Sequence, residues 1–512
     1  MRPLPAQSNR KRRRRRVMLE RGICHLAAAC LAATGLISMP SLLEARSVNG
    51  PIEGRITLGQ GTFAHAPANY VVSEFFLDGT ANAYSLGGDI TADGKWQAET
   101  SGHAAYKTRM VVARPSDAAK FNGTVVVEWL NVSSGTDGAP DWNYLHRELV
   151  REGYAYVGVS SQKVGLDGGR MAMPGVLPVK QADPERYGSL AHPGDAYSYD
   201  IFSQAGLAIR DRKSGLLGSL KPDRILAMGE SQSAAFLTTY VNAIDPQERV
   251  FDGFLIHSRF RGAAPIDGDF LSSMQARESG VAVKSVQIRA DVRVPVLMFI
   301  TETDLMAPVV GFLPARQGDS ARIRTWEVAG TAHADTYTIV GSTIDSGSAT
   351  SAQLARAFTP TAEMMGLSLG KPMNAAPQHH YVMEAALSAL NSWVATGKAP
   401  PSAPTLSVAD GAPPTLIVDR FGNSVGGIRS PWMDVPTATF SGLGQSGPGF
   451  AMLFGTTFSF DENRLAELYP GGKRDYLSKF EASLRSAIEA GFILPADELE
   501  IRNLAAAMYP GE

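Results

Sequence analysis

Cysteine is almost missing from this sequence of 512 residues. Its two cysteines, Cys24 and Cys30, stand near the N-terminus, so the rest of the chain can form neither a disulfide nor a thiolate metal site. The histidines are scattered and form no H-x-x-H or H-E-x-x-H pattern. We therefore expect no bound metal and no other cofactor.

A strong charge of one sign is also missing. Lys and Arg number 48 against 50 Asp and Glu, which gives a net charge of −2 at pH 7. This balance argues against a nucleic-acid-binding protein, because such domains are strongly basic. Only the N-terminal segment departs from it, with the basic run Arg10 to Arg16.

Long hydrophobic runs are missing apart from one at the N-terminus. That run, 22–39, follows the basic segment and precedes Ser41 to Ala45. This order is typical of an export signal, and the Gly, Ser and Thr within the run disfavour a membrane span. We expect cleavage near Ala45, a periplasmic or extracellular product, and no membrane association afterwards. Arg15-Arg16 resembles the twin-arginine export pattern, so that route and general secretion both stay open.

From residue 124 onward, apolar strand patterns alternate with helix patterns. The expected strands are 124–130, 155–159, 224–228, 251–256, 294–300 and 323–328, and the expected helices are 141–152, 199–212 and 232–242. Apolar strands separated by helices indicate an α/β fold with a mostly parallel sheet and helices on both faces. Two earlier strands, 70–77 and 106–112, look antiparallel and fit the first edge of that sheet.

The chain divides into three parts on this interpretation. An export signal covers 1–45, a core covers 46–400, and an extension covers 401–512 after the Pro-rich joint 399–404. The extension has short apolar stretches, with helix patterns at 462–468 and 474–490, and no flexible linker precedes it. We expect it to pack on the core.

The first chemical signal is Gly229-Glu230-Ser231-Gln232-Ser233, which lies between an apolar strand and a helix pattern. A tight strand-to-helix turn with small flanking residues would expose the hydroxyl of Ser231 above the sheet, at a helix N-terminus. Ser233 stands where glycine is usual, but it is also small. The alternative is that Ser231 only caps the helix, since serine is a favoured N-cap residue.

The residues that follow favour catalysis. A nucleophilic serine needs a base, and the base needs an acid to orient it. Glu302 and Asp304 follow one predicted strand and His333 follows the next, so all three stand at the strand ends where catalytic groups gather in α/β sheets.

These motifs resemble the α/β-hydrolase superfamily, and in particular secreted bacterial α/β-hydrolase domain proteins, over about residues 60 to 400. The resemblance implies Ser231 as nucleophile, His333 as general base and Asp304 as the acid, because Asp304 to Pro308 is similar to the superfamily pattern D-x-x-V-P. Glu302 remains the alternative acid. The resemblance also implies that the insertion after the sixth strand, 259–293, roofs the pocket.

Other site residues follow with less support. The oxyanion donors are assigned to the backbone N–H of Gln232 and that of Asn131 or Val132, although Asn131 could instead be a turn residue. Glu230, Trp129 and His257 are candidates for substrate contact, although His257 could instead be a core or loop histidine. The segment 164–192, with Met171 and Met173, is either a pocket wall or a surface loop. His379-His380 is expected to cap a helix or face the surface.

The sequence therefore predicts an exported serine hydrolase that cleaves a small or polymeric carboxylic ester through an acyl-enzyme. Acyl transfer, lactone cleavage and amide cleavage would use the same residues. A non-catalytic binding protein that retains the fold is the remaining alternative. Neither nucleic acid nor membrane is expected as a partner.

Overall fold

The computed structural model describes residues 46–169, 175–268, 270, 282–364, 366–447 and 449–510. The expected signal peptide and the wall residues Met171 and Met173 lie outside these ranges. Residues from Leu43 onward group into one compact unit. No helix within the described ranges is long and apolar enough to span a membrane.

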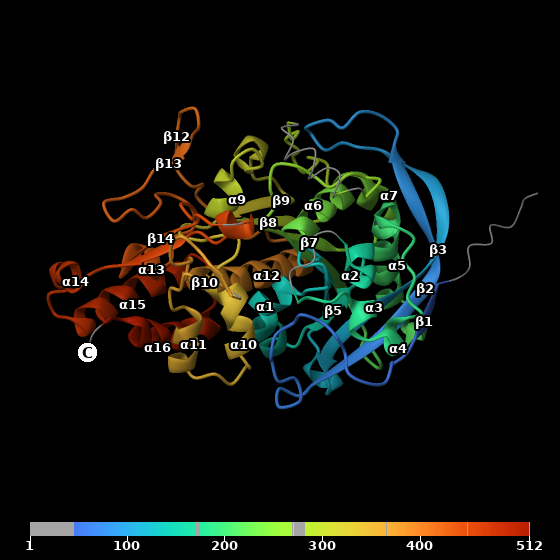
Figure 1. The fold of residues 1–512 in the computed structure, drawn as a ribbon, viewed down its shortest axis with the longest axis horizontal. Helices are drawn as coiled ribbons and strands as arrows, with labels where there is room; N and C mark the ends of the chain where they lie inside the picture. The colour runs from blue at the N-terminus through green and yellow to red at the C-terminus, as the bar shows by residue number, and fades with distance from the viewer. Residues whose placement is uncertain are drawn as a thin grey trace, which may run out of the picture. The chain divides into compact units, whose positions relative to one another are not determined.

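The described part of that unit is built on a nine-stranded sheet with the order β1-β2-β3-β5-β4-β6-β7-β8-β9 (Figure 1). The first three strands and the β3/β5 pair are antiparallel, and the pairs from β5 through β9 are parallel. The prediction of a mostly parallel sheet with an antiparallel edge is confirmed. The strands are β1 (Ser47–Asn49), β2 (Tyr70–Leu86), β3 (Ala98–Pro115), β4 (Thr124–Trp129), β5 (Ala155–Val159), β6 (Arg224–Glu230), β7 (Gly253–His257), β8 (Val296–Ile300) and β9 (Ile323–Glu327).

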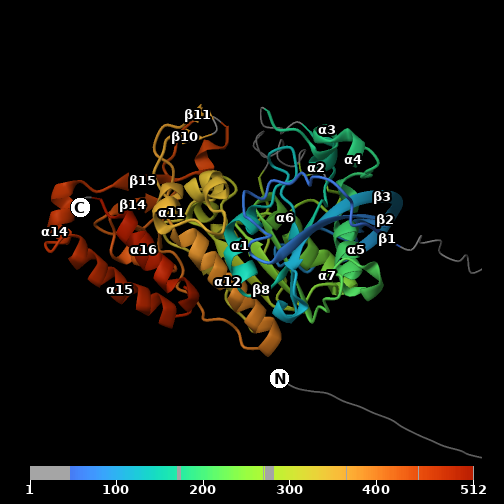
Figure 2. The same cartoon turned by 90° about the horizontal axis from the view of Figure 1, so that it is seen from below.

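Helices cover both faces of the sheet. Every residue of β4, β5, β7 and β8 is buried, and successive side chains of a strand point to opposite faces, so both faces must be covered. Helices α1 (Pro140–Arg151) and α12 (Gln378–Thr396) pack on each other and on β6, and α6 (Gln232–Thr239) contacts β6 and β7 (Figures 1 and 2). The other α-helices that the structure describes before residue 400 are α2 (Lys163–Asp167), α3 (Val179–Ala182), α4 (Pro184–Tyr187), α5 (Ser198–Arg210), α7 (Asp245–Glu248), α9 (Glu302–Met306), α10 (Ser342–Ile344) and α11 (Ser351–Ala357).

Three elements differ from the sequence prediction. Strands β2 and β3 are much longer than the expected 70–77 and 106–112, because they continue as a paired ribbon to Leu86 and back from Ala98. Residues 98–105 are largely exposed, so they lack the apolar alternation that marks a strand in sequence. The helix expected at 232–242 ends as an α-helix at Thr239 and continues as a π-helical turn, Tyr240–Ile244.

The extension joins the sheet at its β9 edge. The backbone N–H of Ile428 donates to the carbonyl of Glu327 at 2.7 Å, and the N–H of Ala329 donates to the carbonyl of Ile428 at 3.0 Å. In both views α13 to α16 lie at the end of the unit opposite β1 to β3 (Figures 1 and 2). Its elements are β12 (Val408–Ala409), β13 (Thr415–Leu416), α13 (Pro431–Asp434), β14 (Ala438–Ser441), β15 (Thr456–Ser459), α14 (Glu462–Leu468), α15 (Lys473–Glu489) and α16 (Glu498–Met508). Two short hairpins, β12-β13 and β14-β15, and the pair β10 (Glu363–Met364) and β11 (Leu367–Ser368) complete the sheets.

Candidate active site

Ser231 stands on a strained turn between β6 and α6. Its backbone has φ 58° and ψ −114°, a conformation that non-glycine residues rarely adopt. A Cβ at Gly229 would lie only 2.9 Å from Cβ of Ser233, so the two flanking residues approach as closely as their size allows. The turn therefore requires the small residues that the sequence has there, and Ser233 meets this requirement in place of glycine.

The structure brings Ser231, His333 and Asp304 together in one hydrogen-bonded chain. Nδ1 of His333 lies 2.6 Å from Oδ1 of Asp304, and Nε2 lies 2.8 Å from Oγ of Ser231. Because an ionised carboxylate only accepts, Nδ1 carries the proton and Nε2 is left to accept from the serine hydroxyl. This is the geometry that activation of a serine by a general base requires.

The environment of the chain supports these protonation states. Burial alone would raise the pKa of Asp304, but His333 and the hydrogen bonds from Thr301 outweigh it and hold that pKa below its ordinary value. Burial opposes a charge on His333, but Asp304 and then Glu230 outweigh it and raise the pKa of the imidazole above its ordinary value. Asp304 is held at the start of α9 by a capping box, in which it accepts from the N–H of Thr301 at 2.8 Å. Phe260, which follows β7, stacks on the His333 ring with a centroid distance of 5.1 Å.

Glu302, the alternative acid, forms its hydrogen bonds with residues other than His333. Its carboxylate accepts from the N–H of Gly330 at 2.5 Å, from the N–H of Gly442 at 2.8 Å and from the hydroxyl of Ser424. Two of these donors belong to the extension. None of the hydrogen bonds described for Glu302 involves His333, so only Asp304 of the two carboxylates contacts the histidine.

Glu230 lies beside the histidine, where a substrate contact was predicted. Its Oε1 is 3.2 Å from Nε2 of His333, and its Oε2 accepts from Nδ2 of Asn131 at 3.0 Å. The side chain is 10% exposed, and burial raises the pKa of Glu230 to about 8 against the opposing effect of His333. The two ring nitrogens of His333 therefore each face a carboxyl group.

The loop after β4 presents one free backbone donor next to α6. The N–H of Asn131 donates to the carbonyl of Gly138 at 2.9 Å, and its side chain accepts from the N–H of Ser133 at 2.8 Å. Asn131 is thus the turn residue of the two alternatives and is wrong as an oxyanion donor, because its N–H is already used. Within the described residues, the backbone N–H groups of Val132 and Gln232 have no hydrogen-bond acceptor, as expected of donors that face a substrate.

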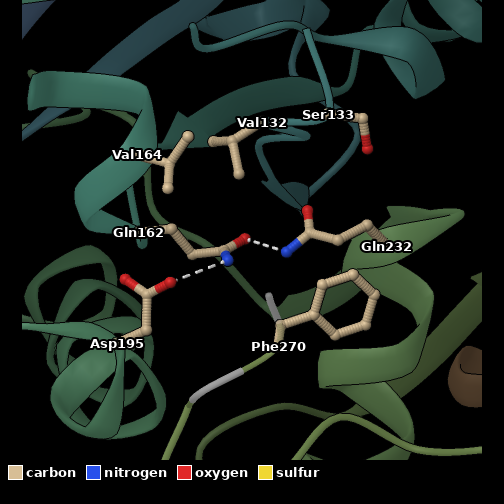
Figure 3. Close-up of a pocket in the computed structure, with 7 residues that line it drawn as sticks. All are labelled: Val132, Ser133, Gln162, Val164, Asp195, Gln232 and Phe270. Atoms are coloured by element: carbon tan, nitrogen blue, oxygen red, sulfur yellow. Dashed lines mark hydrogen bonds between the residues drawn. The ribbon is translucent and has the colours of Figure 1, made fainter. Parts of the chain in front are cut away.

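A pocket lies beside Ser231, because Gln232, the next residue, is part of its lining (Figure 3). Trp129 does not line it. The indole is fully buried and supports the pocket from behind by donating from Nε1 to Oε1 of Gln162 at 3.0 Å. The lining residues are Val132, Ser133, Gln162, Val164, Asp195, Gln232 and Phe270. Gln162 and Asp195 are missed by the sequence analysis, although Gln162 lies three residues after the end of β5, at the strand end where such residues gather.

The other histidines form a separate, buried network. Nδ1 of His257 lies 2.7 Å from Oδ1 of Asp141, and its Nε2 lies 2.8 Å from Nε2 of His379. His257, His379 and His380 are all buried, so His257 is the core histidine of its two alternatives, and the prediction that His379 and His380 cap a helix or face the surface is wrong. They lie inside the packing of α12 on the sheet. No group of three His, Cys, Asp or Glu side chains in the described ranges could hold a metal ion.

A mostly parallel sheet with a serine on a strained strand-to-helix turn and a histidine at the adjoining strand ends defines the α/β-hydrolase fold. The model of the alpha/beta hydrolase domain family matches residues 45–503, and the chain belongs to that family. No curated protein matches the sequence.

Solved esterase structures are also similar, at low identity. Esterase Est22 has a TM-score of 0.26 and 10% identity over 46% of this chain, and the aligned part spans 64% of Est22. The carboxylesterase EST55 of Geobacillus stearothermophilus has a TM-score of 0.31 and 12% identity over 62% of this chain and 84% of that one. Acetyl xylan esterase 1 of a Thermoanaerobacterium species has a TM-score of 0.25 and 12% identity over 48% and 80% of the two chains.

Proposed function

We propose that the protein is an exported serine hydrolase that cleaves carboxylic esters through an acyl-enzyme. The single observation that carries the proposal is the hydrogen-bonded chain from Asp304 through His333 to Ser231. It supplies a nucleophile, a base and an acid in the arrangement that acyl transfer uses.

In the first half of the reaction, Oγ of Ser231 attacks the ester carbonyl while Nε2 of His333 takes the hydroxyl proton. The N–H groups of Val132 and Gln232 stabilise the oxyanion of the tetrahedral intermediate. His333 then gives the proton from Nε2 to the leaving alkoxide, and the alcohol departs. Asp304 stays ionised and stabilises the imidazolium.

In the second half, water attacks the acyl carbonyl and gives a proton to Nε2 of His333. The intermediate collapses, the proton returns to Oγ of Ser231, and the carboxylic acid is released. No cofactor takes part. Transfer to an alcohol in place of water, or cleavage of a lactone or amide, would use the same steps.

We assign Glu230 a positioning role in this scheme. With Oε1 3.2 Å from Nε2 and the neighbouring Asn131 holding Oε2, it can share a proton with the imidazole. That proton must leave before Nε2 can accept from Ser231. Glu230 therefore influences the pH at which the base becomes available.

The test is intact-protein mass spectrometry after treatment of the mature protein with a fluorophosphonate. We expect one adduct on the parent protein and none on Ser231→Ala, because only an activated serine reacts. Ser233→Ala is the matched control, since it removes a buried hydroxyl two residues away and keeps a small side chain. A folded parent protein that forms no adduct, or an adduct that persists in Ser231→Ala, would contradict the proposal.

Export is tested separately by expressing the full chain in bacteria and determining the N-terminus of the product in each cell fraction. We expect a product that begins close to residue 46 outside the cytoplasm. An uncleaved chain that stays in the cytoplasm would refute export and leave the hydrolase proposal untouched.

A further inference from the structure

The pocket beside Ser231 has a polar wall whose hydrogen bonds run in one direction. Figure 3 shows Gln162, which follows β5, facing Gln232 at the start of α6, with Asp195 beyond Gln162. Nε2 of Gln232 donates to Oε1 of Gln162 at 2.6 Å, and Nε2 of Gln162 donates to Oδ2 of Asp195 at 3.2 Å. The indole of Trp129 donates to the same Oε1 of Gln162 at 3.0 Å.

The two ends of this chain fix the orientation of both amides. An indole N–H can only donate, and an ionised carboxylate can only accept. Turning the amide of Gln162 over would place a donor against Trp129 and an acceptor against Asp195. Oε1 of Gln162 must therefore accept from Gln232, and Gln232 must donate from its Nε2.

This orientation leaves an acceptor in the pocket wall. Oε1 of Gln232 is buried and has no hydrogen-bond partner within the described residues, and the side chain as a whole is 7% exposed. In Figure 3 it points away from Gln162, on the side where Ser133 lies. A buried acceptor without a partner costs free energy that a ligand carrying a donor would recover.

The remaining wall is consistent with that preference. Asp195 adds a carboxylate, and none of the seven lining residues that the structure describes is Lys or Arg. An anionic group would meet like charge there, and a plain alkyl group would leave the acceptor unpaired. The pocket also begins at the residue whose N–H is assigned to the oxyanion, so its occupant is attached close to the reacting carbonyl.

We propose that this pocket is a subsite for a hydroxyl or protonated amine carried by the ester substrate close to its reacting carbonyl. The inference rests on the proposed hydrolase function and names its substrate class. Substrates are esters of hydroxylated acids or polyols, in preference to simple alkyl or anionic esters.

The test compares matched esters with the parent protein. On the acyl side, 4-nitrophenyl 3-hydroxybutanoate is compared with 3-methylbutanoate, which replaces the hydroxyl by a methyl group, and with the anionic succinate monoester. On the alcohol side, 2-hydroxyethyl butanoate is compared with propyl butanoate. We expect kcat/KM to favour the hydroxyl ester roughly tenfold in one series, the effect of about one hydrogen bond, and to be lowest for succinate.

The variant Gln232→Met tests whether the preference comes from this wall. It removes both amide atoms at similar side-chain length and keeps the backbone N–H, so the ratio between the matched esters should fall to about one. Gln162→Met should reduce the same ratio, because the amide of Gln232 is then free to turn. Gln247→Met, the same change at an exposed position, should keep the parent ratio.

Fluorophosphonate labelling of each variant separates the two proposals. A labelled protein that hydrolyses hydroxyl and methyl esters equally in both series overturns the subsite and leaves the serine hydrolase intact. A preference that survives in both pocket variants overturns it too. A parent protein without labelling overturns the function on which the subsite rests.

Discussion

Two hydrogen-bonded chains of side chains, each with a carboxylate and an imidazole, lie side by side at the carboxyl ends of the strands. They differ in the group to which the far nitrogen of the imidazole is hydrogen-bonded. Asp304 and His333 lead to the hydroxyl of Ser231, whereas Asp141 and His257 lead to another imidazole, His379. The two chains meet at the backbone, because the N–H of Ser231 donates to the carbonyl of His257 at 3.0 Å.

The two hydrogen-bonded chains also shift the pKa of their histidines in opposite directions. Asp304 and Glu230 raise the pKa of His333, whereas burial and His379 lower the pKa of His257 well below its ordinary value. A buried acid-histidine pair at 2.7 Å is thus no mark of catalysis by itself. What separates the two chains is a nucleophile on a strained turn at the far nitrogen, next to an open pocket.

The sharpest way to break this comparison is to change the two histidines in the same way. His333→Gln should lower kcat by roughly 10⁶-fold, since the base is lost, and should cost less stability than His257→Gln, because Asp304 keeps its hydrogen bond from Thr301. His257→Gln should instead destabilise the fold by about 3 kcal/mol, because it leaves Asp141 buried without its partner. Ester hydrolysis and urea unfolding measure both effects, and an inactive His257→Gln of full stability would mean that the second chain takes part in catalysis.

The two carboxylates in the first turn of α9 give the next largest contrast. Asp304→Asn should lower kcat by about 10⁴-fold, because the amide no longer holds the imidazole in the required tautomer. The conservative substitution Glu302→Gln is the matched control for activity. An equal loss of kcat in both variants at equal stability would refute the assignment of Asp304 as the acid.

Glu302→Gln should lower the free energy of unfolding. The carboxylate accepts hydrogen bonds from Gly330, Ser424 and Gly442, and an amide nitrogen cannot accept them all. We expect a loss of about 1 to 3 kcal/mol in the free energy of unfolding. Urea titration of the mature protein measures it, with Asp304→Asn as the comparison; unchanged stability would show that the carboxylate does not tie the extension to the core.

The smallest expected effect concerns Glu230. Its charge raises the pKa of His333, and the base acts only when Nε2 has lost its proton, so the acidic limb of kcat/KM lies at higher pH with Glu230 present. Glu230→Gln should move that limb to lower pH by about one unit. Asp304 and Asp141 also act on this pair, as do His257 and Tyr144, and the variant leaves all four unchanged.

The pH profile of kcat/KM for one ester, measured for both proteins, tests this prediction. A residue with only a structural role would lower activity without moving the limb. A limb that stays in place would therefore remove Glu230 from the positioning role.

Much of the fold could be predicted from the sequence, because strands buried on both faces are largely apolar. The apolar run that precedes Gly229 to Ser233 predicts a strand, and with it the turn on which Ser231 stands. Asp304 and His333 each follow a predicted strand in the same way. These signals are local. Each needs only a few neighbouring residues to be recognised.

The rest depends on contacts between distant segments. The N–H of Asn131 is used by Gly138, Glu302 is held by Ser424, and Gln162 is oriented by Asp195. None of these pairs has a sequence spacing that predicts it. Glu230 had a local signal, its place beside the serine, but its direction toward His333 is set by Asn131.

The hydrogen bonds from Ser424 and Gly442 to Glu302 also set an order of events during synthesis. The chain is made from its N-terminus, so Ser231, Asp304 and His333 all exist before the segment that completes the loop around Glu302. A nascent chain that stops short of Ser424 has the reacting residues without two of the donors that bind the neighbouring carboxylate. The carboxylate beside the catalytic acid therefore gains its last backbone donor only when nearly the whole polypeptide has been made.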